Sequence, residues 1–257
     1  MTDQIDKIDR PLAVVILAAG KGSRMRSDLH KVLHPLCGKP MIFHLLDTVQ
    51  KLDPERKIVV VGEGRQQVMD AVKNVDFAFQ EKQLGTGHAL QCCQENLKDF
   101  SGDILVLYGD VPLISEETIK EIQKAHYGSS GKRPMVTVLG FRPEDGKEYG
   151  RLVLNGQGQL DAIVEYKDAS DDIRKLDFCN SGIMMLRSEA LFSFVDMIED
   201  NNANQEFYLT DLVAIARTHG HFCTTVEASP IEVTGVNSRS ELKALEQEMI
   251  ESGQYEI

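Results

Sequence analysis

The stretch LAVVILAAGKGSRM, residues 12–25, decides the fold. Its first six residues, Leu12–Leu17, form a short, continuous apolar run rich in valine and isoleucine, which is typical of a parallel strand covered on both faces. The run ends in a turn that contains Gly20 and Gly22. Open α/β sheets bind their ligands beyond the carboxyl ends of such strands, so the stretch predicts an α/β fold with a site at this turn.

The turn combines glycines with cations. Glycine tolerates positive φ and lets backbone N–H groups approach a ligand closely, and such amides form an anion-binding nest. Arg24, Arg26 and Lys31 follow Gly20 and Gly22 and add full positive charges. The pattern indicates phosphate binding. The alternative is an ordinary strand-to-loop turn with solvated bases, because glycine often marks only a turn.

Two common phosphate loops do not fit this turn. The chain has no GxxxxGK[ST] segment, which a Walker loop requires. A dinucleotide-binding loop requires GxGxxG, and here Met25 stands where the third glycine belongs. The failed spacings exclude a P-loop enzyme and a dinucleotide-binding Rossmann enzyme.

Composition narrows the class of protein. Forty acidic against 28 basic residues give the 257-residue chain a net charge of -12, which disfavours general binding of nucleic acid. No window approaches the roughly 18 apolar residues of a membrane span, and the charged N-terminus lacks a signal core. The five cysteines show no CxxC spacing, which is typical of reduced thiols. We therefore expect a soluble, cytoplasmic protein that contacts neither membrane nor nucleic acid.

Strand-like and helix-like segments alternate through the first half, which predicts a Rossmann-like α/β fold with a mostly parallel sheet and helices on both faces. The second half contains more strand and predicts a smaller mixed β region over the sheet edge, within the same domain, residues 1–257. The expected strands are residues 12–17, 57–62, 75–80, 103–114, 135–141, 150–166 with a hairpin turn at 155–158, 178–186, 221–228 and 231–236. The expected helices are residues 40–52, 64–73, 86–97, 115–126 with Ser115 as N-cap, 188–200, 208–218 and 238–253.

A second group of candidate residues lies in FQEKQLGTGHAL, residues 79–90. Gly85 precedes Thr86 at the start of a helical pattern, and free N–H groups at a helix N-terminus suit a phosphate or a carbonyl. Gln80 and Gln83 carry amides that can pair with the edge of a nucleobase. The alternative is a loop with an N-cap.

A third candidate is Asp110, which follows the strand predicted at residues 103–114. A carboxylate at the carboxyl edge of a sheet is a natural ligand for Mg²⁺, which prefers oxygen donors. The alternative is a turn aspartate before Val111 and Pro112.

These motifs together resemble a known family. The run Leu17-Ala18-Ala19-Gly20-Lys21-Gly22-Ser23-Arg24-Met25, followed by Lys31, resembles the signature LAAGxGTRM…PK of sugar nucleotidyltransferases. Ser23 replaces the usual threonine and His30 replaces the usual proline before the lysine. The segment QxxxxGTGHA resembles the uracil-binding segment of bacterial N-acetylglucosamine-1-phosphate uridyltransferase, and further segments follow in order to about residue 242.

The resemblance implies roles for individual residues. It assigns residues 11–128 to a nucleotide-binding half, 129–237 to a sugar-binding half and 238–253 to a C-terminal helix. Catalytic residues would be Arg24, Lys31 and Asp110. Nucleotide-binding residues would be Leu17, Ala18, Ala19, Gly20, Gly22, Arg24, Lys31, Gln80, Gly85 and Thr86. Sugar-binding residues would be Tyr108, Gly109, Gly150, Glu165, Asn180 and Asn237, and Asp110 and Asn237 would hold Mg²⁺.

The implied reaction is Mg²⁺-dependent transfer of a uridylyl group from UTP to N-acetylglucosamine 1-phosphate, giving UDP-N-acetylglucosamine, a cell-envelope precursor, and pyrophosphate. A phosphate monoester with a second pKa of about 6 is already largely dianionic near neutrality, so we expect no general base. We likewise expect no general-acid role for His88. The alternatives are a related nucleotidyltransferase with another sugar 1-phosphate or NTP, and a non-catalytic UDP-sugar-binding protein.

One family feature is absent from this sequence. Bifunctional members of the family carry a C-terminal β-helix of hexapeptide repeats that acetylates glucosamine 1-phosphate, and this chain shows no hexapeptide period. No acetyltransferase activity is expected of these residues. The sequence leaves open whether the chain is a stand-alone enzyme or one domain of a longer protein, and it leaves the oligomeric state open.

Overall fold

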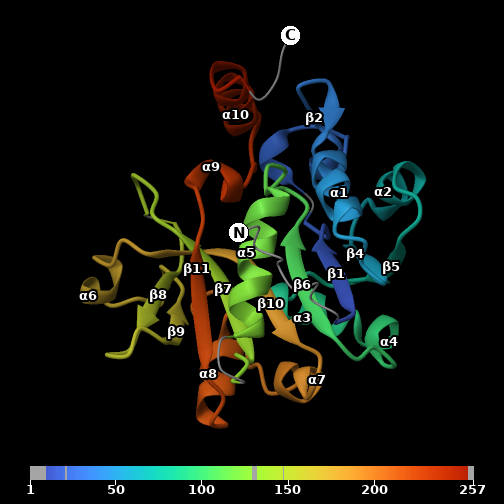
Figure 1. Ribbon diagram of the computed structural model, residues 1–257. Helices are drawn as coiled ribbons and strands as arrows, with labels where there is room; N and C mark the ends of the chain where they lie inside the picture. The colour runs from blue at the N-terminus through green and yellow to red at the C-terminus, as the bar shows by residue number, and fades with distance from the viewer. Residues whose placement is uncertain (1–9, 21, 129–131, 147, 254–257) are drawn as a thin grey trace, which may run out of the picture.

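A nine-stranded sheet forms the centre of the protein (Figure 1). The computed structural model describes residues 10–20, 22–128, 132–146 and 148–253, so Lys21 of the signature lies outside it. The strands of this sheet are β1 Leu12–Leu17, β4 Arg56–Val61, β5 Asp76–Phe79, β6 Asp103–Tyr108, β7 Val136–Phe141, β8 Arg151–Leu154, β9 Leu160–Val164, β10 Cys179–Arg187 and β11 Cys223–Glu227. Their order is β5-β4-β1-β6-β10-β7-β11-β9-β8.

The apolar run predicted as a doubly covered strand is β1, and it pairs in parallel with β4 and β6. Ala13 and Val15 face one hydrophobic cluster, and Val14 and Ile16 face the other. Because successive side chains of a strand point to opposite faces, a strand between two helical layers must be apolar at every position. This requirement explains the continuous run.

Helices cover both faces of the sheet. The helices are α1 Met41–Lys51, α2 Arg65–Ala71, α3 Thr86–Gln91, α4 Gln94–Leu97, α5 Glu116–Tyr127, α6 Asp171–Arg174, α7 Leu191–Val195, α8 Asp211–Thr218, α9 Pro230–Val233 and α10 Arg239–Glu251. Two 3₁₀ turns, η1 Ser23–Met25 and η2 Lys31–Leu33, and a small pair of strands, β2 Pro35–Leu36 and β3 Lys39–Pro40, lie between β1 and α1. Helices α1, α2 and α5 contribute to the cluster beneath Val14, and α3, α7 and α8 to the cluster beneath Val15. None of the described helices is long and apolar enough to cross a membrane.

The sheet changes character at β10. Strands β5, β4, β1 and β6 are parallel, whereas β10 runs antiparallel to both β6 and β7. Strands β8 and β9 form an antiparallel hairpin farther along the sheet. The predicted turn at residues 155–158 is confirmed, because Gly158 donates its N–H to the carbonyl of Asn155 and adopts a φ of +75°. The mixed β region predicted for the second half is therefore part of the same sheet.

Four predicted elements differ from the structure. The helix expected at residues 188–200 is reduced to α7, and the strand expected at residues 103–114 is reduced to β6. Residues 231–236, expected as a strand, contain the short helix α9 and a following loop. Pro230 occupies the first turn of α9, a position that proline favours, and an apolar run of this length does not distinguish a strand from a helical turn. The helix expected at residues 86–97 is divided into α3 and α4.

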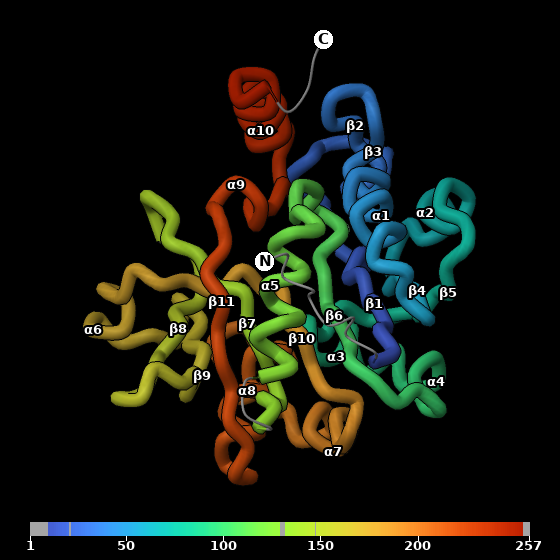
Figure 2. The backbone as a smooth tube through the Cα atoms, viewed as in Figure 1, coloured from blue at the N-terminus to red at the C-terminus, as the bar shows by residue number. Residues whose placement is uncertain are grey.

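The C-terminal helix packs beside the signature turn. Ser238 caps α10 by accepting the N–H of Glu241, and the predicted end at Gly253 is confirmed by its φ of +71°. Figure 2 shows α10 near the β2–β3 pair. A small apolar cluster joins the two: Met25, Leu36, Met41, Val236, Leu242, Leu245 and Met249.

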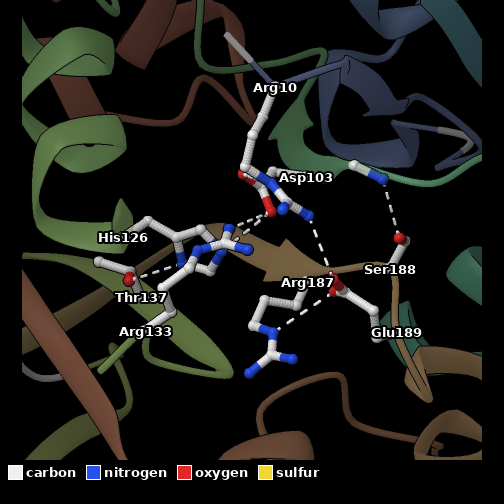
Figure 3. Close-up of polar contacts among 9 residues, drawn as sticks. Arg10, Asp103, His126, Arg133, Thr137, Arg187, Ser188 and Glu189 are labelled. Atoms are coloured by element: carbon white, nitrogen blue, oxygen red, sulfur yellow. Dashed lines mark hydrogen bonds and ion pairs between the residues drawn. The ribbon is translucent and has the colours of Figure 1, made fainter. Parts of the chain in front are cut away.

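A buried charge cluster lies at the amino end of β6 (Figure 3). The Asp103 side chain is fully buried and forms ion pairs with Arg133 at 2.6 Å and Arg10 at 3.5 Å. His126 of α5, also fully buried, contacts the same carboxylate at 3.6 Å and bonds Thr137 of β7. The cluster joins the segment before β1 to α5 and β7 at the edge of the sheet opposite the signature turn.

Candidate active site

The site begins where β1 and β6 end side by side. Leu17 and Tyr108 are register partners, and Gly109 donates its N–H to the carbonyl of Leu17 at 3.0 Å. A Cβ on Gly109 would lie 3.2 Å from the Cβ of Ala18. The loops that follow the two strands therefore leave the sheet in close contact, and they bring the signature turn beside Asp110.

Three residues far apart in the sequence meet at this point. Lys31 Nζ lies 2.5 Å from Asp110 Oδ2 and 3.1 Å from Asn237 Oδ1. The side chains of Lys31 and Asp110 are largely buried, with 12% and 16% of their surfaces exposed. Val236 donates its N–H to the carbonyl of Asp110 at 2.8 Å, which fixes the segment that carries Asn237. The structure thus brings together a cation and both candidate metal ligands.

Gly22 determines where Lys31 lies. Its φ is +67°, and a Cβ at this position would lie 2.5 Å from the Cβ of Lys31. Only glycine lets the two backbones approach so closely without strain. The second glycine of the signature therefore acts by making room for Lys31, and Gly22 itself does not line the cavity described next.

A cavity of about 240 Å³ opens beside Lys31. It brings together most of the residues that the sequence assigns to the nucleotide: Leu17, Ala18, Ala19, Gly20, Lys31, Gln80, Gly85 and Thr86. Tyr108 and Asp110 also line it, together with Val32, Gln83, Ala89 and Glu206. We refer to it as the first cavity.

The glutamine amides of the first cavity connect its loops. Gln83 donates to the carbonyl of Ala19 at 2.6 Å, and Gln80 donates to the carbonyl of Gly85 at 2.9 Å. Gln80 Nε2 also lies 3.1 Å from Nδ1 of His88. Burial lowers the pKa of His88, so its neutral form is favoured. His88 does not line the cavity and holds Gln80 in place.

A second cavity of about 620 Å³ shares Thr86, Tyr108 and Glu206 with the first. Glu165 and Asn180, two candidates for the sugar, line it. Gly150 lies behind Glu165, because a Cβ at Gly150 would be 3.2 Å from Glu165 Oε2. The remaining lining residues are Glu148, Tyr166, Lys167, Asn204, Tyr208 and Thr210.

Glu165 lies in an acidic environment. Burial raises the pKa of its carboxyl, and the nearby Asp168, Asp211 and Glu206 act in the same direction. Thr210 opposes the shift by donating its hydroxyl to Glu165 Oε1 at 3.2 Å. Burial also raises the pKa of Asp211 to about 6. The second cavity therefore presents a carboxyl that gains a proton more readily than an exposed glutamate does.

The segment that closes the second cavity docks onto the GTG loop. Phe207 donates its N–H to the carbonyl of Leu84 and accepts the N–H of Gly87, each at 2.8 Å. Leu209 donates its N–H to Thr86 Oγ1 at 3.0 Å. Glu206, which borders both cavities, and Thr210, which bonds Glu165, lie in this segment. Sequence reasoning did not single out Glu206 or Thr210, although both lie in the stretch NQEFYLTDLV, residues 204–213, within the part of the chain whose segments follow the family order.

Arg24 lies apart from both cavities. It lines a separate groove with Arg26, Arg239, Ser238 and Ser240, at the N-terminus of α10. Within the described part of the chain, the guanidinium groups of Arg24 and Arg26 form no ion pair. The groove adjoins the site, because Asn237 precedes Ser238 and its side chain contacts Lys31. The structure therefore places Arg24 and Lys31 in two neighbouring regions, and the catalytic role of both residues stays a prediction.

The oxygen donors fit a hard divalent cation. Asp110 Oδ2 and Asn237 Oδ1 both contact the Lys31 ammonium, so a positive charge is already accommodated between them. Over the described ranges, no group of three His, Cys, Asp or Glu side chains is arranged to hold a metal ion. One carboxylate and one amide oxygen suit Mg²⁺, which completes its coordination with waters and substrate phosphates.

Comparison with known proteins gives consistent matches. The model of the MobA-like NTP transferase domain matches residues 14–172. Bifunctional protein GlmU of Rhizorhabdus wittichii is 51% identical over 242 residues, covering 93% of this chain and 53% of the relative. The protein of the same name from Zymomonas mobilis is 46% identical, covering 92% of this chain and 53% of the relative. The chain thus spans about half the length of the curated relatives it matches.

Two solved structures share the fold. A putative glucose-1-phosphate thymidylyltransferase from Bacillus anthracis superposes with a TM-score of 0.69 at 18% identity, covering 92% of this chain and 94% of that one. HddC from Yersinia pseudotuberculosis superposes with a TM-score of 0.65 at 19% identity, covering 92% and 99%.

Fold and site together define a nucleotidyltransferase, an enzyme that transfers a nucleotidyl group from a nucleoside triphosphate to an acceptor. The chain belongs to the family of MobA-like NTP transferase domains. The resemblance found in the sequence motifs is confirmed, since the chain matches the N-terminal region of proteins named GlmU.

Proposed function

We propose that the protein transfers a uridylyl group from UTP to N-acetylglucosamine 1-phosphate and releases pyrophosphate. The observation that carries this proposal is the contact of Lys31 with Asp110 and Asn237 at the first cavity, which Lys31 and Asp110 line. The second cavity adjoins the first through shared lining residues, Thr86, Tyr108 and Glu206. The first cavity contains the residues that resemble a uracil-nucleotide site, and the second contains those that resemble an N-acetylglucosamine site.

The five cysteines, all unpaired, support a reducing cytoplasmic setting.

The substrates would meet at Tyr108 and Thr86, which line both cavities. The nucleobase would lie against Gln80 and Gln83, whose fixed amides leave further donor and acceptor positions. The sugar would lie in the second cavity, where Glu165 accepts hydrogen bonds from hydroxyl groups and Asn180 serves both hydroxyl and acetamido groups. This arrangement directs the sugar phosphate toward the α-phosphate of the nucleotide.

In the proposed mechanism, an oxygen of the sugar phosphate attacks the α-phosphorus in line, and the bond to the β-phosphate oxygen breaks. The nucleophile is already an anion, since the second pKa of a phosphate monoester is about 6, and it needs no general base. The barrier is electrostatic, because a dianion must approach a triphosphate. Lys31 would neutralise charge at the reacting phosphates.

Asp110 and Asn237 would hold Mg²⁺, which would supply charge neutralisation and a template for the two phosphate groups. The neutral side chain of Asn237 leaves more of the cation's charge for the substrates than a second carboxylate would. Lys31, whose ammonium contacts the oxygens of both side chains, would instead reach toward the nucleotide. In this structure the ammonium therefore lies where these two oxygens could contact a metal ion.

The arginine groove would receive the β- and γ-phosphates. Arg24, Arg26 and Arg239 bring three cations together in a chain of net charge -12, without an acidic partner for Arg24 or Arg26 among the described residues. Clustered like charges repel, and a bound polyanion offsets that repulsion. The groove adjoins Asn237, where the pyrophosphate would separate.

The test is pyrophosphate release with Mg²⁺ across four NTPs and a panel of sugar 1-phosphates. Turnover confined to UTP with N-acetylglucosamine 1-phosphate, and abolished by EDTA, is the expected result. Turnover with another pair would keep the mechanism and correct the specificity. Absence of turnover with every pair, alongside tight binding of UDP-N-acetylglucosamine, would overturn the proposal.

A further inference from the structure

The residue before Lys31 differs in type from the signature, but its φ is one that proline allows. The signature has proline there, and this chain has His30. His30 adopts φ -57° and ψ 138°, and this φ lies within the range that a proline ring imposes, about -65 ± 15°. The loop therefore enters η2 with a conformation that proline would fix covalently, although histidine by itself leaves φ free.

A single glutamine side chain holds this conformation. Gln67 of α2 accepts the N–H of His30 through Oε1 at 2.9 Å and donates through Nε2 to the carbonyl of Asp28, also at 2.9 Å. Only one orientation of the amide satisfies both bonds, because Oε1 cannot donate and Nε2 cannot accept. A proline at residue 30 has no N–H and could not take part.

The segment held by Gln67 leads directly into Lys31. Leu33 donates its N–H to the carbonyl of His30 at 2.9 Å, and His34 donates to the carbonyl of Lys31 at 3.2 Å, which forms the η2 turn. The His30 ring is buried, with 5% of the residue exposed. Fixing the N–H of His30 therefore fixes the start of the turn from which Lys31 reaches Asp110.

We propose that Gln67 is a positioning residue for Lys31, and that its two hydrogen bonds replace the proline ring of the signature. The inference rests on the proposed function only in that Lys31 acts on a substrate phosphate. It explains why histidine at residue 30 is compatible with a fixed position of Lys31. The backbone of residue 30 is held by the Gln67 side chain of α2, where the signature uses a proline ring.

The test is a double-mutant cycle with the four proteins wild type, Q67A, H30P and H30P/Q67A. Q67A is expected to lower kcat about five-fold, the equivalent of one ordinary hydrogen bond, with little change in KM for the sugar phosphate. In the H30P background the same Q67A change is expected to have no further effect, because the ring now fixes φ. Equal losses in both backgrounds, or no loss from Q67A in wild type, would overturn the proposal.

The chain offers a matched control on the same helix. Gln66 is exposed like Gln67, but its amide bonds Asp70 within α2 at 2.8 Å. Q66A is expected to leave kcat unchanged, and an equal loss from Q66A and Q67A would assign the effect to helix stability. If H30P fails to fold, Q67E replaces it, since the carboxylate keeps the acceptor for His30. Q67E is expected to retain more activity than Q67A, and the reverse order would contradict the role of the His30 bond.

Hydrogen exchange separates this inference from the proposed function. Q67A is expected to raise the exchange rate of the His30 amide several-fold, and Q66A is not. This readout needs no substrate, so it remains informative if the enzyme uses a different NTP or sugar. Unchanged exchange in Q67A would overturn the inference while leaving the proposed function in place.

Discussion

Strand β6 has an aspartate near each end, and the two differ in their burial and in their ion-pair partners. Asp103, at the amino end, is fully buried and forms ion pairs with Arg10 and Arg133. Asp110, two residues beyond the carboxyl end, remains partly exposed and is held by Lys31 and Asn237. The first charge is balanced by two arginines and is remote from both cavities. The second is balanced by one lysine, and both side chains line the first cavity.

The difference shows that the two ends of one strand serve different purposes: the aspartate at the amino end stabilises the fold, and the aspartate at the carboxyl end lies in the proposed catalytic site. A buried carboxylate with several fixed partners stabilises the fold only while all of them are present. A carboxylate whose only charged partner is one lysine can release that lysine to a bound ligand and then bind a metal ion in its place. The carboxyl edge is where the loops diverge and leave room for ligands, and the amino edge is closed by α5 and the segment before β1.

The largest expected effect tests the role of Asp110. Asp110→Ala removes the carboxylate assigned to Mg²⁺ and frees Lys31, and it should lower kcat by about 10³-fold or more. The melting temperature should also fall, because the largely buried Lys31 ammonium keeps only its contact with Asn237. Steady-state kinetics and thermal unfolding measure the two quantities. A tenfold loss or less would remove Asp110 from the chemistry.

Asp103→Asn tests the other end of the strand. It leaves Arg10 and Arg133 without their carboxylate and should cost about 3 kcal/mol of stability at pH 7, with kcat per folded molecule unchanged. Burial raises the pKa of Asp103, but His126 and Arg133 outweigh it and the net pKa is lowered. The stabilisation is therefore complete above about pH 4, the unfolded value, and is lost as pH falls through the folded value.

Chemical denaturation of Asp103→Asn and wild type at pH 7 and pH 3 checks this prediction. The two proteins should differ most at pH 7, and the difference should be smaller at pH 3. A difference that grows on acidification would show that the ionised carboxylate does not stabilise the fold.

Gly22→Ala tests how Lys31 is placed at the carboxyl edge. The new methyl group collides with Lys31 and strains the positive φ, so kcat should fall about 10²-fold, the cost of a misplacement near 1 Å. Gly156→Ala is the matched control, because its Cβ enters open space in the β8–β9 turn. Comparable losses in the two variants would show that Gly22 has no special relation to Lys31.

Glu165→Gln tests the second cavity. It should raise KM for the sugar phosphate about ten-fold, since a hydrogen bond to a charged acceptor is replaced by a neutral one. Because the pKa of Glu165 is raised, mainly by burial, wild-type affinity should rise with pH as this carboxyl ionises. The Gln variant should show no such rise. An identical pH profile of KM in both proteins would assign the titration to another group.

The smallest expected effect is that of His88→Ala. His88 holds Gln80 from outside the first cavity, so its loss should raise KM for UTP about three-fold and leave kcat unchanged. A large fall in kcat with intact folding would give His88 a chemical role and contradict a mechanism without a general acid.

Local patterns predicted the elements whose signals lie within a few residues. The run Leu12–Leu17 became β1, Ser115 became the N-cap of α5, and residues 155–158 became a hairpin turn. The pattern failed at residues 231–236, where a short apolar run fits a strand and a helical turn equally well. It also gave no sign that β10 would enter the sheet antiparallel beside β6, because strand order depends on contacts between distant segments.

The sequence by itself determined the chemistry of the site: a glycine turn with cations, an aspartate after a strand, and a set of motifs in family order. Tertiary structure alone decided their relations. It brought Lys31, Asp110 and Asn237 into contact, placed Arg24 in a separate groove, and set Gln67 against the backbone of His30. The physical reason is that residue types carry donors, acceptors and charge, whereas distances between them arise only when the sheet pairs its strands and the helices bury its two faces.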